Sequence, residues 1–328
     1  MYAIEQTRFG GPEELRRTEI PDVEAAPGFV RIRVEAAGVH LIDAQVRSGV
    51  AEALPFSLPE LPMVPGREVA GTIDRLGEGV DPSWAGRRVV THLGMAFGGY
   101  AELAVREVEA LHAIPEGVSP EVAVAMIGTG RTTVGILRRA AIETDEVVLV
   151  LAAGGGIGAI AVQALAARGV TVVGVAGGPE KTARVAALAP GVVAVDYLDP
   201  DWPSRVRQRL SGRDINVVLD GVGGDVGRAA FDLLGFGGRI VLFGWSAGDV
   251  TPVSVADLYA RNATAMVALG SSIIPKRGGI RALETEALRL VEDGVVRPLT
   301  TAFPLGRAAD AHAALQSRAT VGKVVLIP

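Results

Sequence analysis

The stretch Val147–Ala167, "VVLVLAAGGGIGAIAVQALAA", decides the fold of this protein. Its first residues are apolar without alternation, which is typical of a buried strand, and its last residues carry apolar side chains at helical spacing. Between them stands a glycine cluster that fits Gly-x-Gly-x-x-Ala at Gly154, Gly156 and Ala159. The same cluster also fits Ala-x-x-Gly-x-x-Gly, at Ala152, Gly155 and Gly158.

A glycine cluster between a buried strand and a helix is typical of dinucleotide binding. Backbone N–H groups and the helix N-terminus face the pyrophosphate, and no Cβ stands in the way. The alternative is a glycine turn kept for packing. We predict that this segment binds a dinucleotide.

The residues that follow repeat the same unit. Apolar strands alternate with helical segments as far as the strand "GRIVLFG". Strands that are apolar on both faces and alternate with helices predict a parallel, doubly wound α/β sheet. The helical segments that we expect are 156–168, 180–188, 203–211 and 225–234.

The segments on either side of this sheet have a different pattern. In Phe29–Val39, "FVRIRVEAAGV", apolar and charged residues alternate with the period of a half-buried strand, and the chain ends in the strand "GKVVLIP". We therefore expect an α/β domain inserted in a β-rich domain. The β-rich domain would comprise residues 1–121 and 272–328, and the dinucleotide-binding domain residues 122–271.

The residue that usually selects the cofactor is missing. About twenty residues after the glycines, where NAD-binding domains carry an acid on the adenosine ribose, stands Gly177. A glycine leaves room for a 2′-phosphate that a carboxylate would repel, and Lys181 supplies a countercharge. Glu180 lies in the first turn of the next helix, where acids favour the helix dipole. The predicted cofactor is NADPH; otherwise Lys181 is an ordinary solvated lysine.

Composition excludes several classes of function. The 328 residues suffice for about two domains, and with a net charge of −5 and no basic cluster, nucleic acid is not an expected partner. The chain has no cysteine, which excludes disulfides, thiol nucleophiles and thiolate metal sites and fits a reducing cytosol. Without a signal-peptide pattern or a long apolar run, we expect a cytoplasmic protein with no membrane span.

Seven motifs distributed over nearly the whole chain resemble one family. They are "AAGVHLIDAQVRSG", "LPMVPGREVAGTIDRLGEGV", "FGGYAE", "GTGRTTVG", "AAGGGIG", "DGVGG" and "SRATVGKVVLIP". Together they resemble the medium-chain dehydrogenase/reductase superfamily, and within it the zinc-free quinone oxidoreductases of the zeta-crystallin type. The resemblance implies a chaperonin-10-like β-barrel domain that carries the substrate site and an inserted Rossmann domain that binds NADPH.

The resemblance also implies which residues bind the cofactor. Gly177, Lys181, Tyr197 and Arg318 would form the 2′-phosphate site, and Lys323 matches a terminal basic position of many relatives. Thr132 would lie by the nicotinamide mononucleotide half, Gly154, Gly155, Gly156 and Ile157 would line the pyrophosphate, and Phe243, Gly244, Trp245, Ser246, Leu269, Gly270 and Ser271 would flank the nicotinamide.

The zinc-dependent branch of the superfamily is not matched. Its first ligand, a cysteine, is His40 here, and the His of its Gly-His-Glu motif is Arg67. A guanidinium does not bind zinc near neutral pH, so we expect no metal. Without a Lewis acid the acceptor must already be electrophilic, as quinones and α,β-unsaturated carbonyls are. The predicted function is NADPH-dependent reduction of such small molecules.

His40 and Asp43 are the candidate catalytic residues. His40 stands where the quinone oxidoreductases typically carry Asn, and we interpret it as a donor to the acceptor's oxygen or to the nicotinamide ribose. The alternative is a neutral imidazole satisfied by the backbone. Asp43 could instead cap a turn or pair with Arg47. We interpret the other histidines as structural: His92, His112 and His312.

Two further functions stay open. An enoyl-thioester reductase would need a basic patch for a carrier phosphopantetheine, and none is evident in the sequence. A catalytically idle NADPH-binding protein with a structural or sensing role is the other. The segment "SVADLYARNAT" predicts a helix before the edge strand "TAMVALG". In relatives that strand pairs across a two-fold axis, so the resemblance implies a homodimer.

Overall fold

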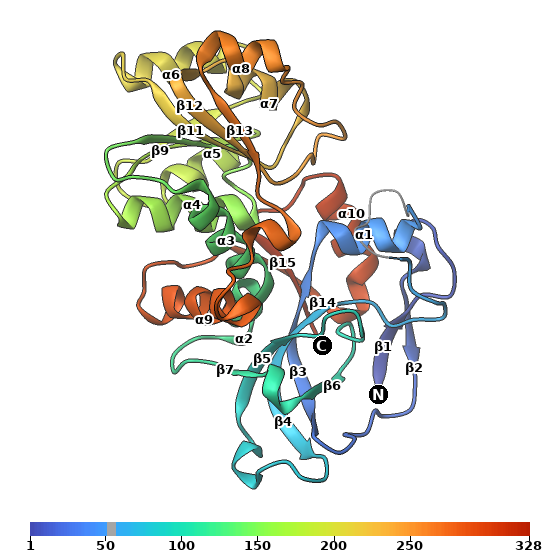
Figure 1. The fold of residues 1–328 in the computed structure, drawn as a ribbon. Coiled ribbons are helices and arrows are strands. Elements are labelled where there is room, and N and C mark those ends of the chain that lie inside the picture. The colour runs from blue at the N-terminus through green and yellow to red at the C-terminus, as the bar shows by residue number, and fades with distance from the viewer. Residues whose placement is uncertain (51–56) are drawn as a thin grey trace. The chain divides into compact units, whose positions relative to one another are not determined.

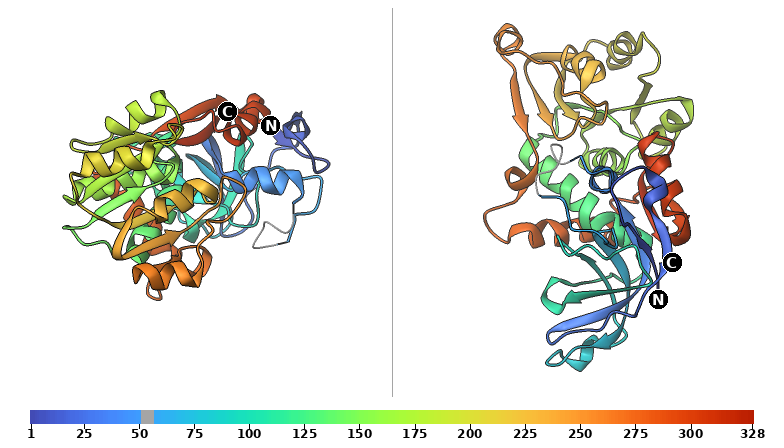
Figure 2. Two further views of the ribbon diagram at one scale, coloured as in Figure 1. Left: turned by 90° about the horizontal axis from the view of Figure 1, so that it is seen from above. Right: turned by 90° about the vertical axis from the view of Figure 1, so that its right-hand side faces the viewer.

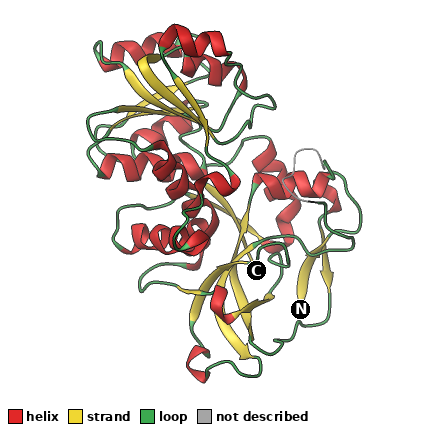
Figure 3. Ribbon diagram, in the orientation of Figure 1, coloured by secondary structure: helices red, strands yellow, loops and turns green. Residues whose placement is uncertain are grey.

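The computed structural model describes residues 1–50 and 57–328. The described chain forms two compact units, one of residues 1–129 and 298–328 and the other of residues 130–297. The first unit is built mainly on strands, whereas the second alternates strands with helices (Figure 3). The predicted α/β fold with an inserted parallel sheet is confirmed.

A mainly antiparallel sheet forms the first unit (Figure 1). Its central strand is β3 (Phe29–Val39), which pairs with β4 (Glu68–Leu76) and with β15 (Lys323–Ile327). The alternation seen in the sequence buries Val30, Ile32 and other apolar side chains in one cluster. The other strands of this sheet are β5 (Arg88–His92), β6 (Leu103–Glu107), β7 (His112–Ala113) and β14 (Thr300–Pro304).

Short elements complete the first unit. A two-stranded sheet is formed by β1 (Tyr2–Glu5) and β2 (Arg16–Glu19). The described helices are α1 (Leu41–Ser48), α2 (Pro120–Ala125) and α10 (Ala308–Gln316). Helix α1 begins directly after β3 and ends at Gly49, whose φ of +77° is readily adopted by glycine. Because α1 starts where β3 stops, the residue between them, His40, lies at the end of the central strand.

A parallel sheet forms the second unit, with the strand order β10-β9-β8-β11-β12-β13 in the described residues. All its pairings are parallel, as strands apolar on both faces predict. Its strands are β8 (Val147–Val150), β9 (Thr171–Ala176), β10 (Val193–Asp196), β11 (Ile215–Asp220), β12 (Leu234–Leu242) and β13 (Thr264–Val267).

Helices cover both faces of the parallel sheet (Figure 2). One buried cluster contains residues of α3 (Arg131–Ala140), α4 (Gly156–Ala167) and α5 (Pro179–Ala186). A second cluster contains residues of α6 (Trp202–Leu210), α7 (Gly224–Phe231) and α8 (Val255–Arg261). The four helical segments expected from the sequence are thus present, with ends displaced by up to three residues.

The observed units differ from the predicted domain boundaries. Helix α9 (Gly279–Glu292), which we placed in the β-rich domain, packs against α3 of the second unit and buries Leu283 and Ala287 there. Helix α2 packs on β3 and β4, so the first unit runs to residue 129 instead of 121. Helix α9 is amphipathic, and the sequence pattern does not say against which sheet or helix its apolar face packs.

No helix among residues 1–50 and 57–328 is long and apolar enough to cross a membrane.

Candidate active site and cofactor site

His40 is the N-cap residue of helix α1. Its backbone N–H donates to Oδ2 of Asp43 at 2.7 Å, and the N–H of Asp43 donates to the His40 carbonyl at 3.1 Å. A carboxylate at the third helical position that accepts the N-cap N–H is half of a capping box. Asp43 therefore fixes the backbone of His40, which agrees with the turn-cap alternative for this aspartate.

The imidazole of His40 meets two charged side chains from the neighbouring strands. Nε2 of His40 lies 2.6 Å from Oε1 of Glu68 and 2.8 Å from Nζ of Lys323. The second carboxylate oxygen, Oε2, lies 2.8 Å from the same Nζ. Glu68 begins β4 and Lys323 begins β15, and both strands pair with β3 where it leads into His40. The register of three strands thus assembles the cluster.

The carboxylate of Glu68 is buried and ionised. Glu68 is 0% exposed and Lys323 is 4% exposed. Burial by itself raises the pKa of Glu68, but the charges of His40 and Lys323 outweigh burial and hold its pKa well below the usual range. Burial lowers the pKa of Lys323, against the opposing pull of Glu68. Burial removes the hydration of both charges. Their mutual attraction compensates for that loss, because they lie side by side.

Two glycines make room for this carboxylate. An ideal Cβ on Gly128 would lie 1.4 Å from Oε1 of Glu68, and one on Gly38 would lie 2.2 Å from Oε2. Any side chain at either position would displace the carboxylate. Gly128 belongs to the turn after α2, so the end of that helix helps to shape the cluster.

Asp43 is the centre of a second buried network. Its carboxylate lies 3.5 Å from Nε of Arg67 and 3.4 Å from the hydroxyl of Tyr100. That hydroxyl lies 3.0 Å from Nε2 of His312. Burial raises the pKa of Tyr100 well above its usual value and lowers the pKa of His312 to about 4. Both groups are therefore neutral near pH 7, and Asp43 carries the negative charge of the network.

The predicted alternative pairing of Asp43 with Arg47 is not what holds Asp43. The guanidinium of Arg47 donates instead to Oε1 of Gln316 at 2.8 Å, while Asp43 pairs with Arg67. In the sequence, Arg67 stands where the zinc-dependent branch has a histidine. The structure gives this substitution a positive role as the counterion of a buried aspartate.

Sequence reasoning missed Glu68 and Tyr100. Both stand in motifs that were quoted for the resemblance, "GREVAG" and "FGGYAE". A glutamate that starts an otherwise apolar strand was a signal that could have been used, because a charge at a buried strand position needs a partner. His92, interpreted as structural, lies opposite Glu68 in the pairing of β4 with β5.

The groups at the superfamily's zinc positions do not fit a metal ion. Nε2 of His40 lies 2.8 Å from the ammonium of Lys323, and a cation already next to a ligand nitrogen opposes a second one. The other position is occupied by the guanidinium of Arg67. Within the described part of the chain, no group of three or more His, Cys, Asp or Glu side chains could hold a metal ion.

In the second unit, the glycine cluster lies between β8 and α4. Gly155 is the N-cap of α4, and Gly154, Gly156 and Ile157 surround it. Close packing requires a glycine at one position of the cluster: an ideal Cβ on Gly158 would lie 2.4 Å from the carbonyl oxygen of Ala152. The first N–H groups of α4 have no partner within the helix, and N–H groups in this position suit the pyrophosphate of a dinucleotide.

Gly177, Tyr197 and Lys181 lie around the ends of β9 and β10. Gly177 follows β9 directly, and an ideal Cβ there would lie 2.6 Å from the hydroxyl oxygen of Tyr197. Lys181 lies beside the glycine cluster, with its Cβ 3.5 Å from an ideal Cβ on Gly154. The tyrosine hydroxyl therefore fills the position from which an NAD-binding acid would project.

An acid is nevertheless close to this position. Oδ1 of Asp196, the last residue of β10, accepts the N–H of Gly178 at 2.8 Å and the N–H of Leu198 at 2.9 Å. These hydrogen bonds join the loops after β9 and β10 and support the position of Tyr197. Asp196 is thus used to shape the loops, a role that the sequence alone did not indicate.

The remaining predicted residues of the second unit also follow strand ends. Phe243 and Gly244 come directly after β12, and the ring of Phe243 packs where a Cβ on Gly221 would lie. Leu269 follows β13, and Thr132 is in the first turn of α3. The carboxyl ends of parallel strands share one edge of the sheet. The exposed members of the set at this edge are Trp245, Ser246, Leu269, Gly270 and Ser271.

The last two predicted cofactor residues belong to the first unit. Lys323 lies in the buried cluster with Glu68 and His40, as described above. Arg318 follows α10 in an exposed turn, with a φ of +57°. The structure thus assigns to Lys323 a partner in the first unit that the resemblance did not imply.

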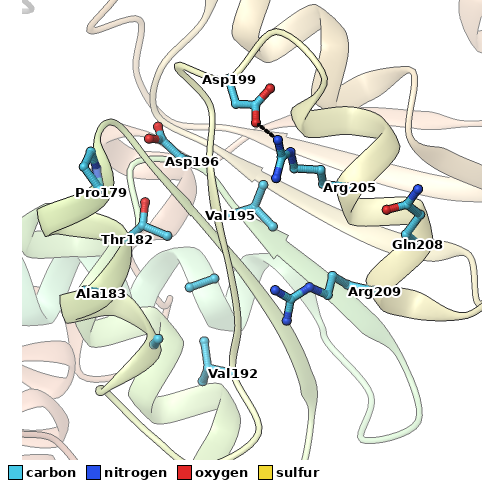
Figure 4. Close-up of a pocket in the computed structure, with 12 residues that line it drawn as sticks. Pro179, Thr182, Ala183, Val192, Val195, Asp196, Asp199, Arg205, Gln208 and Arg209 are labelled. Atoms are coloured by element: carbon cyan, nitrogen blue, oxygen red, sulfur yellow. Dashed lines mark ion pairs between the residues drawn. The ribbon is translucent and has the colours of Figure 1, made fainter.

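A separate groove of about 690 Å³ runs along β10, at the opposite edge of the sheet from β13 (Figure 4). Thr182 of α5 and Arg209 of α6 line it, together with the ion pair of Asp199 and Arg205 at 2.5 Å. None of the predicted cofactor residues lines this groove. It is therefore distinct from the predicted dinucleotide site.

Comparison with known proteins agrees with this architecture. Residues 26–116 match the family model "Alcohol dehydrogenase GroES-like domain", and residues 189–326 match "Zinc-binding dehydrogenase". The chain is 34% identical to the quinone oxidoreductase of Pseudomonas aeruginosa, over 99% of both chains. It is 29% identical to a 2-haloacrylate reductase of Burkholderia sp., over 97% of this chain and 96% of that one.

A solved structure is similar over the full length. The structure of Escherichia coli quinone oxidoreductase complexed with NADPH has a TM-score of 0.86 and 31% sequence identity, and the comparison covers 100% of both chains. A GroES-like domain and a parallel dinucleotide-binding sheet in one chain define an oxidoreductase of the medium-chain dehydrogenase/reductase type. Within that superfamily, the chain belongs to the quinone oxidoreductase family.

Proposed function

We propose that this protein catalyses the NADPH-dependent reduction of a quinone or an α,β-unsaturated carbonyl without zinc. The observation that carries the proposal is the contact at the end of β9, where the hydroxyl of Tyr197 lies over Gly177. The printed names of the relatives, quinone oxidoreductase and 2-haloacrylate reductase, support a small, already electrophilic acceptor.

The second unit supplies the residues for the cofactor. Gly154, Gly155, Gly156 and Ile157, at the start of α4, would hold the pyrophosphate by backbone N–H groups. Lys181 and the hydroxyl of Tyr197 would bind the 2′-phosphate, since both lie at the end of β9. The nicotinamide would supply a hydride to the acceptor. Thr132 and the loops after β12 and β13 would position the nicotinamide half.

The first unit supplies a hydrogen-bond donor. As hydride arrives, the oxygen of the acceptor gains negative charge, and a donor directed at that oxygen stabilises the transition state more than the ground state. His40 is proposed as that donor, since its side chain is 22% exposed and its backbone is fixed by Asp43. Asp43, which is 4% exposed, is then a positioning residue.

An assay of acceptors tests this proposal. With NADPH, the wild type is expected to reduce a small quinone and an enone, but not a saturated ketone, and a chelator is expected to change nothing. His40→Ala should lower the rate by roughly 10²-fold with little change in NADPH affinity, because it removes one transition-state donor. His40→Asn should recover part of the rate, since its amide can donate the same bond.

Several outcomes would contradict the proposal. A preference for the saturated ketone, or stoichiometric zinc that is lost together with activity, would exclude zinc-free reduction of an activated acceptor. Activity restricted to enoyl thioesters would favour the enoyl-thioester reductase. Tight NADPH binding with no oxidation across the panel would favour the structural or sensing role.

We further propose that the protein is a homodimer, paired through β13. This strand is at the edge of the parallel sheet, and Val267 on it is 54% exposed. The preceding helix α8 exposes Tyr259 and Val255 by 84% and 68%. An unpaired edge flanked by apolar side chains is a surface that a second copy can cover across a two-fold axis.

A further inference from the structure

Beneath His40 lies a buried ion pair that the proposed reaction has not used. The side chain of His40 is 22% exposed, whereas Glu68 is 0% exposed and Lys323 is 4% exposed. The imidazole is therefore the accessible end of a cluster whose two charges lie inside the protein. Buried opposite charges are costly to assemble, so a pair placed against a proposed donor raises the question of what it does to that donor.

The pair is in direct contact with one ring nitrogen. Nε2 of His40 lies 2.8 Å from the ammonium of Lys323 and 2.6 Å from a carboxylate oxygen of Glu68. Both contacts involve Nε2, so the pair acts on the ring through this nitrogen. Each oxygen of Glu68 lies within 2.8 Å of a nitrogen of His40 or Lys323, so these two groups hold the carboxylate.

The fold holds the carboxylate in a space that only glycines leave open. A Cβ on Gly128 or on Gly38 would lie 1.4 Å or 2.2 Å from one of its oxygens. The strand register then fixes the lysine, because β15 and β4 pair with the same strand, β3. The two glycines and the strand register thus fix both charged side chains in contact with His40.

The other charged groups near the cluster belong to the surrounding elements. On α1, Asp43 carries a negative charge, and Nε of Arg67, the residue before β4, lies 3.5 Å from it. On β5, His92 stands opposite Glu68. Asp43 and Arg67 largely compensate each other, as Glu68 and Lys323 do. His40 therefore has two opposite charges in contact with it and a second compensated pair beyond them.

We propose that Glu68 and Lys323 are positioning residues for His40, which hold Nε2 and set the protonation of the imidazole that delivers the proton in the reduction. This inference rests on the proposed function. In the step, the hydride adds to the acceptor and leaves an electron pair on its oxygen. An N–H bond of the imidazolium breaks, an O–H bond forms, and the imidazole becomes neutral. Water returns the proton before the next cycle.

Two single variants should act in opposite directions. Glu68→Gln leaves the ammonium of Lys323 uncompensated beside the imidazole, which disfavours the imidazolium. Lys323→Met leaves the carboxylate uncompensated, which favours it. A single charge at this distance shifts a titration by about 1–3 pH units. Relative to the wild type, the titration midpoint of His40 should fall in Glu68→Gln, rise in Lys323→Met, and return toward the wild type in the double variant.

The measurement is an NMR titration of the His40 ring, assigned with His40→Asn, in the full-length protein without cofactor or substrate. A pH profile of NADPH oxidation accompanies it. Because the imidazolium is the donor, activity should be lost at lower pH in Glu68→Gln and should persist to higher pH in Lys323→Met. Arg31→Met is the matched control, because it removes another buried cation of the same sheet that pairs with Asp74 at 2.9 Å. It should not move the midpoint.

Unchanged midpoints in the single variants, or shifts of the same sign, would overturn the inference. Should one single variant not fold, the sign of the other decides, since each has a defined direction. The NMR titration needs no acceptor, so it separates two failures. Opposite midpoint shifts in a protein that oxidises no NADPH would leave the pairing intact and refute the proposed function. Activity on quinones with unchanged midpoints would support the proposed function and refute the role of Glu68 and Lys323.

Discussion

At the scale of single residues, the proposed preference for NADPH rests on the ends of β9 and β10. The hydroxyl of Tyr197 lies 2.6 Å from the place of a Cβ on Gly177, so an acid at that position would meet the tyrosine. The N–H of Tyr197 donates to the carbonyl of Ala176 at 3.0 Å, which holds the tyrosine in register with β9. The absence of a carboxylate at Gly177 and the fixed hydroxyl of Tyr197 are thus linked, because the hydroxyl occupies the space that a side chain at Gly177 would need.

Lys181→Ala tests that arrangement. A hydrogen bond to a charged group contributes about 1.5–3 kcal/mol, so the variant should lose roughly tenfold or more in affinity for NADPH and little for NADH. Titration of cofactor fluorescence measures both affinities. Arg184→Ala is the control, because Arg184 is a cation of the same helix that pairs with Glu180 at 3.3 Å. Equal wild-type affinities for NADPH and NADH would refute the preference.

At the scale of elements, the junction between β8 and α4 depends on close approach of the backbone. The place of a Cβ on Gly158 is 2.4 Å from the carbonyl oxygen of Ala152 and 2.7 Å from the Cα of Ala153. Neither backbone atom can move aside as a flexible side chain would. By contrast, a Cβ on Gly154 would make ordinary contacts, at 3.5 Å from the Cβ of Lys181.

Gly158→Ala and Gly154→Ala should therefore differ in stability. Overpacking against backbone costs about 1–3 kcal/mol, so Gly158→Ala should lower the free energy of unfolding by that amount. Gly154→Ala is the matched control and should be close to the wild type in stability. Denaturant unfolding of the apo protein measures both. Equal stability of the two variants would mean that α4 shifts freely against β8, contrary to the packing described here.

At the scale of the whole molecule, two features stand out: the division of the chain into two units and the exposed edge of the parallel sheet. Helix α9 belongs to the unit of the parallel sheet, where Arg131 and Glu284 form an ion pair at 2.6 Å. In the same unit, β13 is an edge strand of the parallel sheet, and its Val267 is an exposed apolar residue. An exposed edge strand presents backbone N–H and C=O groups with which a second copy can pair.

Val267→Asp tests the proposed dimer. A charge on the edge strand should weaken pairing between two copies, so the variant should shift toward the monomer mass, whereas the wild type should have twice that mass. Light scattering coupled to gel filtration measures it. Leu198→Asp is the control, since Leu198 is 66% exposed and follows β10 at the opposite edge of the sheet. A monomeric wild type would show that β13 does not pair in this way.

Much of the fold followed from local pattern. Continuous apolar runs predicted the parallel strands, and Gly154, Gly156 and the apolar face after them predicted the β8–α4 junction. These features depend on residues close together in the chain, which is why periodicity and glycine spacing reveal them. The ends of the inserted unit did not follow, because α9 could pack its apolar face on either unit.

The sequence by itself determined the parallel sheet, the glycine loop, the absent ribose acid and the choice of His40 as a candidate. Only the tertiary structure decided what surrounds that histidine. Glu68 and Lys323 are 255 positions apart in the chain, and the pairing of β4 and β15 with β3 brings both to Nε2 of His40. A local pattern carries no record of strand register, whereas the charge around a buried group depends on which distant side chains that register places beside it.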